Sequence, residues 1–355
     1  MFITAGPFAS KTVSTNGLEG GETVSTQETK LQVIADAIKT KLGTTDAIQA
    51  SQFATKIATI QTGIAKPGWV NTTMPVNNDW KSVCYGYGKF VAVVRMSNIA
   101  AYSIDGINWT KVTLPISGNW FSVCYGNGKF VAVASSISSS SAIYSTDGIN
   151  WAQTTMPEIR QWSSVCYGNG KFVAVAGNTD LLAYSTDGIT WSSAKMPTSA
   201  HWQSVCYGNG KFVAVAYDSA IAAYSTNGVT WTQTTLPSTA FWYSVCYGNG
   251  KFVVTVGLGN TVAAYSADGI NWTRTALPIS ANWQSICYGN GKFVAVANNN
   301  DGRGAYSPDG ISWTRFALPS GVRWQSVCYG DGKFVVMPDT KDVAAYLKDY
   351  FDEWA

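Results

Sequence analysis

Few residues in this sequence carry the side chains that enzyme chemistry usually needs. The 355-residue chain has a single histidine, His201, so any Ser-His-Asp or Cys-His arrangement would depend on that residue alone. Glycoside hydrolysis usually needs two carboxylates across one pocket. The two candidates, Asp79 and Glu158, are two sequence repeats apart and share no local pattern. We therefore expect that the protein is not an enzyme and that it uses no cofactor.

The seven cysteines do not have the spacing of a metal site or of a disulfide framework. They stand about forty residues apart, each after Val or Ile and before Tyr-Gly, with no CxxC pair or neighbouring histidine. The run Asn298–Gly302 lacks the alternating carboxylates and the final Glu of a calcium loop. We expect no metal, and we expect each cysteine to act as a small buried hydrophobic residue. The cysteines are Cys84, Cys124, Cys166, Cys206, Cys246, Cys287 and Cys328.

Composition excludes several classes of partner. The formal net charge is +3 and no run of Lys or Arg occurs, so we expect neither a nucleic acid nor an anionic membrane surface as partner. No apolar run approaches the roughly 20 residues of a membrane-spanning helix, and the N-terminus lacks the features of a signal peptide. With 46% hydrophobic residues, the chain is long enough for one large domain and a small one. We expect a soluble protein that folds in a reducing cytoplasm.

Tryptophan marks an internal repeat, and this repeat predicts the strands and turns that position the remaining residues. One series recurs at intervals of 40 to 42 residues, and a second series lies eleven residues after each of its first seven members. Together they account for all 15 tryptophans, which indicates a structural role. The first series is Trp69, Trp109, Trp151, Trp191, Trp231, Trp272, Trp313 and Trp354, and the second is Trp80, Trp120, Trp162, Trp202, Trp242, Trp283 and Trp324.

One repeat contains four predicted strands. Residues 120–126 and 129–134 are apolar strands joined by Asn-Gly, the dipeptide of a type I′ hairpin turn. A third strand lies around residues 142–145, a Thr-Asp-Gly turn follows, and residues 150–155 form the fourth strand. Tandem repetition of this unit predicts an all-β fold, a seven-bladed β-propeller of four-stranded antiparallel blades, with a small helical N-terminal module.

A ring of blades must be closed, and the sequence offers two ways to close it. The segment Trp69–Thr73 matches a fourth strand but precedes the first complete blade, while the last repeat lacks the Asp-Gly turn. We predict that Trp69–Thr73 is the outer strand of the seventh blade. The alternative is that the C-terminal segment around Trp354 takes this place.

The turn between the third and fourth strands has a recognisable motif. The sequence Tyr102-Ser-Ile-Asp-Gly-Ile-Asn-Trp109, with five similar copies, resembles the Asp-box of sialidases and other Asp-box propellers. The family pattern has one more residue between Asp and Gly, and Asn227 replaces the Asp in one copy. In that family the Asp-box is a structural turn remote from the active site, so the resemblance implies architecture and no chemistry. The clustered arginines that sialidases use for a substrate carboxylate are not evident.

The first 63 residues differ in composition from the repeats. Residues 1–28 are rich in Gly, Ser and Thr and are expected to be extended. A capping box at Ser25–Glu28 begins a predicted helix that ends at Gly43, and a second helix is expected from Ser51 to Gly63. Two short amphipathic helices cannot form a stable core alone. We expect them to dock on the propeller, on sister subunits or on a larger assembly.

A second resemblance covers about 30 residues of this module. The segments 35–45 (ADAIKTKLGTT) and 50–60 (ASQFATKIATI) resemble a motif found in tail-associated proteins of bacteriophages. The resemblance implies a virion protein, assembled in the host cytoplasm, whose residues 1–63 attach to other tail or baseplate subunits and support homo-oligomerisation. The propeller would then occupy residues 64–355. An ordinary helical hairpin remains the alternative.

The repeats differ from one another on one face only. The turns between first and second strands and between third and fourth strands are nearly identical in all blades, whereas the other two connections vary. A diversified loop face on a rigid scaffold is typical of recognition surfaces. We expect ligand-binding residues near the axis at Asn78, Asp79, Asn119, Arg160, Gln161, His201, Phe241, Asn282 and Arg323, and farther out at Arg95, Asp180, Tyr217, Asp218, Asn300, Asp301 and Arg303.

These observations favour a non-enzymatic phage tail or baseplate protein whose variable propeller face binds a host-surface ligand, most simply a glycan. The main alternative is a purely structural virion protein of the collar, baseplate or decoration type, which contacts only other virion subunits. A cellular lectin unrelated to phages is a third possibility. The loops differ too much for seven equivalent pockets, so we expect one or a few distinct sites.

Overall fold

The structure, a computed structural model, describes residues 2–3, 48–49 and 68–348. The chain divides into two units, residues 1–68 and residues 69–355. In the first unit, strand β1 (Phe2–Ile3) pairs antiparallel with strand β2 (Ile48–Gln49). The two helices expected in this unit, and the boundary expected at residue 63, lie outside the described residues and stay predictions.

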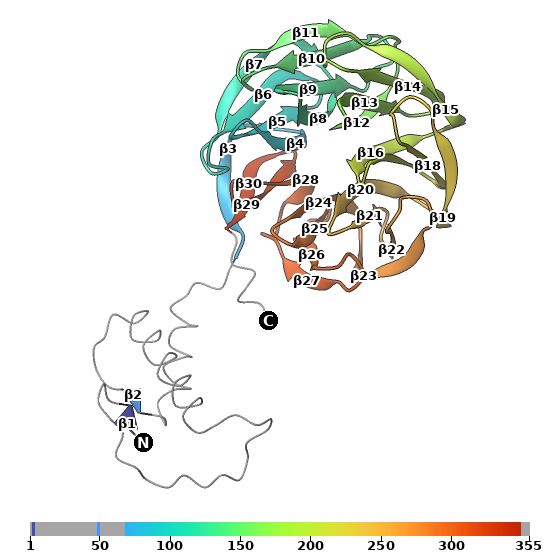
Figure 1. Cartoon of the computed structure of the whole chain (residues 1–355). Coiled ribbons are helices and arrows are strands. Elements are labelled where there is room, and N and C mark those ends of the chain that lie inside the picture. The colour runs from blue at the N-terminus through green and yellow to red at the C-terminus, as the bar shows by residue number, and fades with distance from the viewer. Residues whose placement is uncertain (1, 4–47, 50–67, 349–355) are drawn as a thin grey trace. The chain divides into compact units, whose positions relative to one another are not determined.

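The second unit confirms the predicted seven-bladed propeller of four-stranded antiparallel blades. In the first blade, β4 (Trp80–Gly86) is innermost and β5 (Lys89–Val94), β6 (Ser97–Ser103) and β7 (Thr110–Gly118) follow outward (Figure 1). Over residues 68–348 the structure consists of strands and turns, and it has no helix that could span a membrane. The next five blades are β8 (Trp120–Gly126), β9 (Lys129–Ala134), β10 (Ser141–Ser145) and β11 (Ala152–Thr155); β12 (Trp162–Gly168), β13 (Lys171–Ala176), β14 (Thr179–Ser185) and β15 (Ser192–Ala200); β16 (Trp202–Gly208), β17 (Lys211–Ala216), β18 (Ser219–Ser225) and β19 (Thr232–Ala240); β20 (Trp242–Gly248), β21 (Lys251–Val256), β22 (Asn260–Ser266) and β23 (Thr273–Ala281); and β24 (Trp283–Gly289), β25 (Lys292–Ala297), β26 (Arg303–Ser307) and β27 (Thr314–Ala317).

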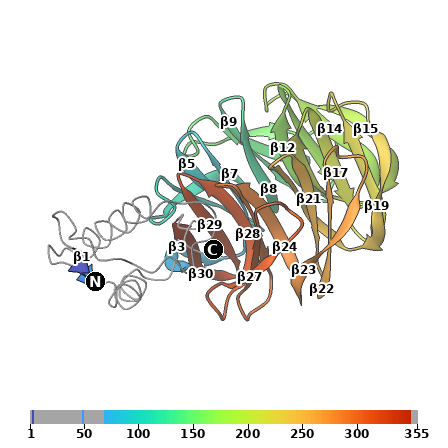
Figure 2. The same cartoon turned by 60° about the horizontal axis from the view of Figure 1, so that its bottom comes forward.

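The seventh blade is closed by a strand from the N-terminal side of the propeller, as predicted. It contains β28 (Arg323–Gly330), β29 (Lys333–Asp339) and β30 (Lys341–Lys348), and its outermost strand is β3 (Val70–Asn78). Both views show β3 beside β30, although the two strands are far apart in sequence (Figures 1 and 2). The alternative closing residue, Trp354, lies outside the described residues, and the outer position of this blade is filled by β3. The ring is therefore fastened by pairing the two ends of the propeller.

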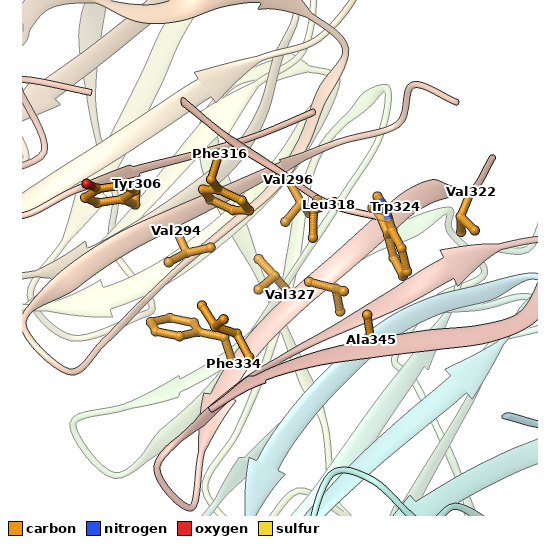
Figure 3. Close-up of a cluster of buried hydrophobic side chains, with 12 residues drawn as sticks. Val294, Val296, Tyr306, Phe316, Leu318, Val322, Trp324, Val327, Phe334 and Ala345 are labelled. Atoms are coloured by element: carbon orange, nitrogen blue, oxygen red, sulfur yellow. The ribbon is translucent and has the colours of Figure 1, made fainter. Parts of the chain in front are cut away.

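The second strand of each blade is buried on both faces because neighbouring blades cover it from either side. Along β5, Val91 and Val93 pack into the core shared with the second blade, while Phe90, Ala92 and Val94 pack toward the seventh. Figure 3 shows one such inter-blade cluster, in which Trp324 and Phe334 of the seventh blade meet valines of the sixth. Burial of these apolar surfaces is the main force that holds the blades together.

Two rings of contacts join the seven inner strands around the axis. In every blade the serine two residues after the inner tryptophan accepts a hydrogen bond from a Val or Ile amide of the next blade; Ser204, for example, accepts from Val245 at 3.2 Å. The inner glycine of each blade lies against a tyrosine of the next, so that a Cβ on Gly208 would lie 2.0 Å from Tyr247. These contacts explain why Ser and Tyr-Gly recur in every repeat. The other serine acceptors are Ser82, Ser122, Ser164, Ser244, Ser285 and Ser326.

The turns on the uniform face are built as the sequence predicts. In the second blade, Asn127 and Gly128 both have positive φ, 45° and 71°, as a type I′ turn requires. In the turn between third and fourth strands, Asp105 Oδ1 accepts hydrogen bonds from the amides of Ile107 and Asn108, both at 2.8 Å. Burial acts to raise the pKa of Asp105, but hydrogen bonds from Asn108, Ile107 and Ser103 outweigh it and lower the pKa to about 2.

These aspartates are expected to make the propeller sensitive to acid. Because the folded pKa lies below the unfolded value of about 4, their stabilisation is present in full above pH 4 and is lost as the pH falls toward 2. Replacing all five with asparagine, which fills the same role at position 227, is expected to flatten the fall in melting temperature between pH 5 and pH 2.5. Parallel curves of melting temperature against pH for wild type and variant would contradict this role of the aspartates. The five are Asp105, Asp147, Asp187, Asp268 and Asp309.

Two sequence expectations need correction. In five blades the outer strand continues to within one residue of the next inner strand, so the expected loop is a single residue. Only the second and sixth blades, where β11 and β27 end early, have longer connections. The cysteines are half-buried rather than buried, Cys328 excepted, and each packs against a core cluster between neighbouring blades. All seven are free thiols, and burial raises the pKa of each.

Candidate functional site

The variable face is organised around the residue before each inner tryptophan, which we call the pre-tryptophan position. In six blades its carbonyl accepts a hydrogen bond of 2.8–3.0 Å from the first residue after the second strand, as between His201 and the amide of Tyr217. In the seventh blade, Arg323 and Asp339 are paired within the strands. The variable face therefore presents seven residue pairs on a similar backbone frame, and in two of them the second residue is a glycine, Gly177 or Gly257. The pre-tryptophan residues are Asp79, Asn119, Gln161, His201, Phe241, Asn282 and Arg323.

A polar cavity of about 100 Å³ lies on the propeller axis. All seven inner strands contribute the residue that follows the tryptophan, and several also contribute the next serine. A register shift between the tryptophan and that serine occurs in every inner strand, and such a bulge re-aims the intervening side chain. These post-tryptophan residues are Lys81, Phe121, Ser163, Gln203, Tyr243, Gln284 and Gln325.

Four aromatic side chains gather beside this cavity, and we call them the aromatic shelf: His201, Tyr217, Phe241 and Tyr243. The Tyr217 ring lies at the centre, with ring centroids 5.3 Å from His201, 5.0 Å from Phe241 and 5.4 Å from Tyr243. All four are half-buried, so part of each ring reaches the surface. Such rings offer apolar area with polar edges. The shelf spans the fourth and fifth blades.

Two glycines leave room for the aromatic shelf. A Cβ on Gly177 would lie 2.9 Å from the His201 ring, and a Cβ on Gly257 would lie 2.5 Å from the Tyr243 ring. Burial lowers the pKa of His201, so its neutral form is favoured at neutral pH. Burial, together with the neighbouring Tyr217, raises the pKa of Tyr243 to about 12. At neutral pH the shelf therefore carries hydroxyl and imidazole groups but no charge.

The first and seventh blades form an ionic part of the same face. Asp79 pairs with Arg95, and Arg323 pairs with Asp339 at 3.1 Å. Lys81 extends into the axial cavity from the first blade. The aromatic shelf and the ionic part thus belong to different blades, which makes the face asymmetric about the propeller axis.

The structure brings together only some of the residues predicted from the sequence. His201 and Phe241 lie at the shelf as expected near the axis, and Tyr217, which was expected farther out, joins them. Asp79 and Arg323 form the ionic part just described. Asn119 and Gln161 occupy the pre-tryptophan position of the second and third blades, where Asn119 Nδ2 donates to the Ser135 carbonyl at 2.9 Å.

The other predicted residues have local structural roles. Arg160 pairs with Glu158 at 2.8 Å, and Arg303 pairs with Asp301 at 2.6 Å. Asp218 is exposed in a tight turn with a φ of 52°. Asn78 and Asn282 accept backbone hydrogen bonds, and Asn300 borders a separate cavity of about 430 Å³ beside Arg323. Asp180 pairs with Lys195 at 3.3 Å. Neither Asp79 nor Glu158 lines the axial cavity.

Sequence reasoning missed the post-tryptophan residues, although a signal was present. The inner strand reads Trp-x-Ser-Val-Cys-Tyr-Gly in every repeat, with Ile for Val once, and x is Lys, Phe, Ser, Gln, Tyr, Gln and Gln. A position that varies inside an otherwise constant segment indicates a side chain whose surroundings do not fix its identity.

In the part of the chain that the structure describes, no group of His, Cys, Asp and Glu could hold a metal ion.

Comparison with known proteins shows likeness in fold. No protein-family model matches the chain, and no curated protein matches it. A virginiamycin B lyase from Staphylococcus aureus is 11% identical, with a TM-score of 0.71 over 79% of this chain and 99% of the lyase. YCF48 bound to D1 peptide is 14% identical, with a TM-score of 0.64 over 80% and 98% of the two chains. The WD40 propeller domain of Doa1 is 14% identical, with a TM-score of 0.61 over 82% and 100%.

These comparisons correct one expectation. We expected a protein that is not an enzyme, but lyases are among the structures that this chain resembles. A single histidine and unpaired carboxylates are therefore not sufficient grounds to exclude catalysis on this architecture. At identities of 11–14%, the likeness shows the fold alone and assigns no reaction or ligand to this chain. The chain has the architecture of a seven-bladed β-propeller.

Proposed function

We propose that this chain is a bacteriophage tail or baseplate protein whose variable propeller face binds a host-surface glycan. The observation that carries the binding role is the contrast between the two faces. One face repeats the same turns in nearly every blade, while the other presents an aromatic shelf and a polar axial cavity on an invariant frame. A rigid scaffold with one diversified surface suits recognition.

The chemistry of the face favours a sugar. The half-buried rings of Tyr217 and Phe241 offer flat apolar area that suits the carbon face of a pyranose. Beside them, the hydroxyl of Tyr243 and the amides of Gln203 and Gln284 line the axial cavity and can exchange hydrogen bonds with sugar hydroxyls. Ligand sites commonly combine aromatic surface with a few such convergent polar groups.

Attachment to the virion is supported by the sequence of residues 35–60, which resembles tail-associated phage proteins. In this proposal, residues 1–63 join the chain to other tail or baseplate subunits and to further copies of itself. The propeller then carries the receptor-binding face. Several copies on one virion would add avidity to a weak single site.

A glycan array tests the binding role. We define a shelf-blank variant that carries His201→Gln, Tyr217→Gly, Phe241→Gln and Tyr243→Gln, since other blades have these residues at the same positions. The full chain is expected to bind a subset of bacterial surface glycans, and the shelf-blank variant is expected to lose at least about tenfold in signal, as for removal of several interface aromatics.

The matched control is Ile104→Thr, which changes a side chain that is 65% exposed on the uniform face to the residue found in three other blades. This variant is expected to bind like wild type. Equal binding by the shelf-blank variant would overturn the site. A folded wild-type chain that binds no glycan would favour the purely structural virion role.

A further inference from the structure

The axial cavity contains one charged side chain among neutral ones. Of the residues that line it, only Lys81 carries a charge, and the others are serines, glutamines, Tyr243 and Phe121. The Lys81 ammonium lies 4.3 Å from the centroid of the Phe121 ring. No hydrogen bond or ion pair in the described part of the chain involves this ammonium, so the ring is its one assigned contact.

Nearby carboxylates are already engaged with other cations. Asp79 pairs with Arg95, and Asp339 pairs with Arg323. Burial, followed by the charge of Arg95, lowers the pKa of Lys81 to about 8, although Asp79 and Asp339 act to raise it. The two ion pairs are neutral as units, so the cavity keeps the single positive charge of Lys81 at neutral pH. A half-buried charge without a counter-ion is unfavourable, and an anion in the cavity would offset this cost.

We infer that the axial cavity binds the carboxylate of an acidic sugar, with the Lys81 ammonium as its counter-ion. This inference rests on the proposed glycan-binding function and specifies the ligand class of the same face. Charge-assisted hydrogen bonds from an ammonium to a carboxylate are stronger than neutral ones. A cavity of about 100 Å³ suits one small polar group of this kind, not a whole oligosaccharide.

The surroundings favour a sugar acid over other carboxylates. Gln203, Gln284 and Gln325 border the cavity with amide groups that can both donate to and accept from ring hydroxyls. Tyr243 borders the cavity and also contacts Tyr217 of the aromatic shelf. A sugar ring that reaches from the shelf to the axis would place its carboxylate toward Lys81. A peptide carboxylate without an adjacent aromatic or proline residue would use the ammonium but would leave the shelf without a ring to stack on.

Calorimetric titration of the full chain with matched oligosaccharides tests the inference. The probes are oligogalacturonate, the neutral galactose oligomer of the same length, and a short peptide with a free carboxyl terminus. Wild type is expected to prefer the uronate by roughly 10- to 100-fold over the neutral oligomer, the range expected for one hydrogen bond to a charged group. Lys81→Met is expected to abolish the preference, and Lys81→Arg to retain most of it. The control Lys111→Met, at an exposed lysine of the same blade, is expected to change nothing.

The pH dependence adds an independent readout. Uronate affinity in wild type is expected to fall as the pH rises past about 8, where Lys81 loses its proton, while Lys81→Arg is expected to keep its affinity because arginine stays charged. The inference is overturned if Lys81→Met keeps the uronate preference or if the peptide binds more tightly than the uronate. If neutral oligomers bind equally well and only the shelf-blank variant loses them, the axial inference fails while the proposed function stands. If no sugar of either kind binds, the axial inference fails, and the glycan array decides whether the proposed function stands.

Discussion

Gly208→Ala is expected to destabilise the propeller by roughly 3 kcal/mol, the upper end for overpacking a well-packed core. A Cβ at this position would lie 2.0 Å from Cγ of Tyr247 in the next blade, and the ring of inner strands leaves neither residue room to move. For a domain of this size the melting temperature should fall by about 6–12 °C. The measurement is thermal unfolding followed by tryptophan fluorescence.

The matched control is Gly210→Ala, two residues along the same hairpin. Gly210 has a φ of 73°, but a Cβ added there would have no atom within 4 Å, so this change adds backbone strain of roughly 1–2 kcal/mol without a clash. A second control combines Gly208→Ala with Tyr247→Ala, which removes the colliding ring. The double variant should lose less free energy of unfolding than the sum of the losses caused by its two single changes. Equal falls in melting temperature for Gly208→Ala and Gly210→Ala would contradict the close contact between Gly208 and the Tyr247 ring.

Removing the closing strand is expected to have the second large effect on stability. In this strand, Met74 is 2% exposed in the core between the first and seventh blades, and just before it Trp69 stacks on Phe316 with ring centroids 5.6 Å apart. A chain that begins at residue 79 would lose these contacts and leave β30 as an unpaired edge, which favours aggregation. Compared with a chain that begins at residue 69, its melting temperature should fall by roughly 10 °C, since burial of two large side chains contributes several kcal/mol.

A peptide of residues 69–78 provides the control for this prediction. Added in excess to the shortened chain, it should restore part of the melting temperature, because anything that binds the folded state alone stabilises it. A scrambled peptide of the same composition should have no effect. Identical melting curves for the chains that begin at 69 and at 79 would show that β3 does not fasten the ring.

Much of the fold could be predicted because nearly the same strand and turn sequences recur in the seven repeats. The Asn-Gly and Asp-Gly turns require backbone conformations that few other residues adopt, and the structure has them where expected. The closing strand could be predicted because Trp69 continues the tryptophan period ahead of the first blade. The length of the outer strands could not be predicted. These strands extend past Pro115 and its equivalents because they pair with the neighbouring strand, and the local sequence does not indicate this pairing.

The site was less predictable, because position on a face does not determine contact between side chains. The sequence predicts His201 and Phe241 as site residues. It does not predict that both rings contact Tyr217, that Tyr243 joins them, or that Gly177 leaves the space in which His201 lies. Arg160 and Arg303 are near acidic neighbours in sequence, and these local ion pairs satisfy them. Lys81 lies within the most regular segment of the repeat, so its position in the sequence does not mark it as a site residue.

Binding to intact bacteria tests the central claim most directly. The full chain, labelled with a fluorophore, is incubated with a panel of bacterial strains, and bound fluorescence is measured for wild type, the shelf-blank variant and Ile104→Thr. The account predicts that wild type and Ile104→Thr stain the same strains and that the shelf-blank variant, which is shown by its melting curve to be folded at the assay temperature, stains none of them. Equal staining by the shelf-blank variant would contradict the claim that the variable face is the receptor-binding surface.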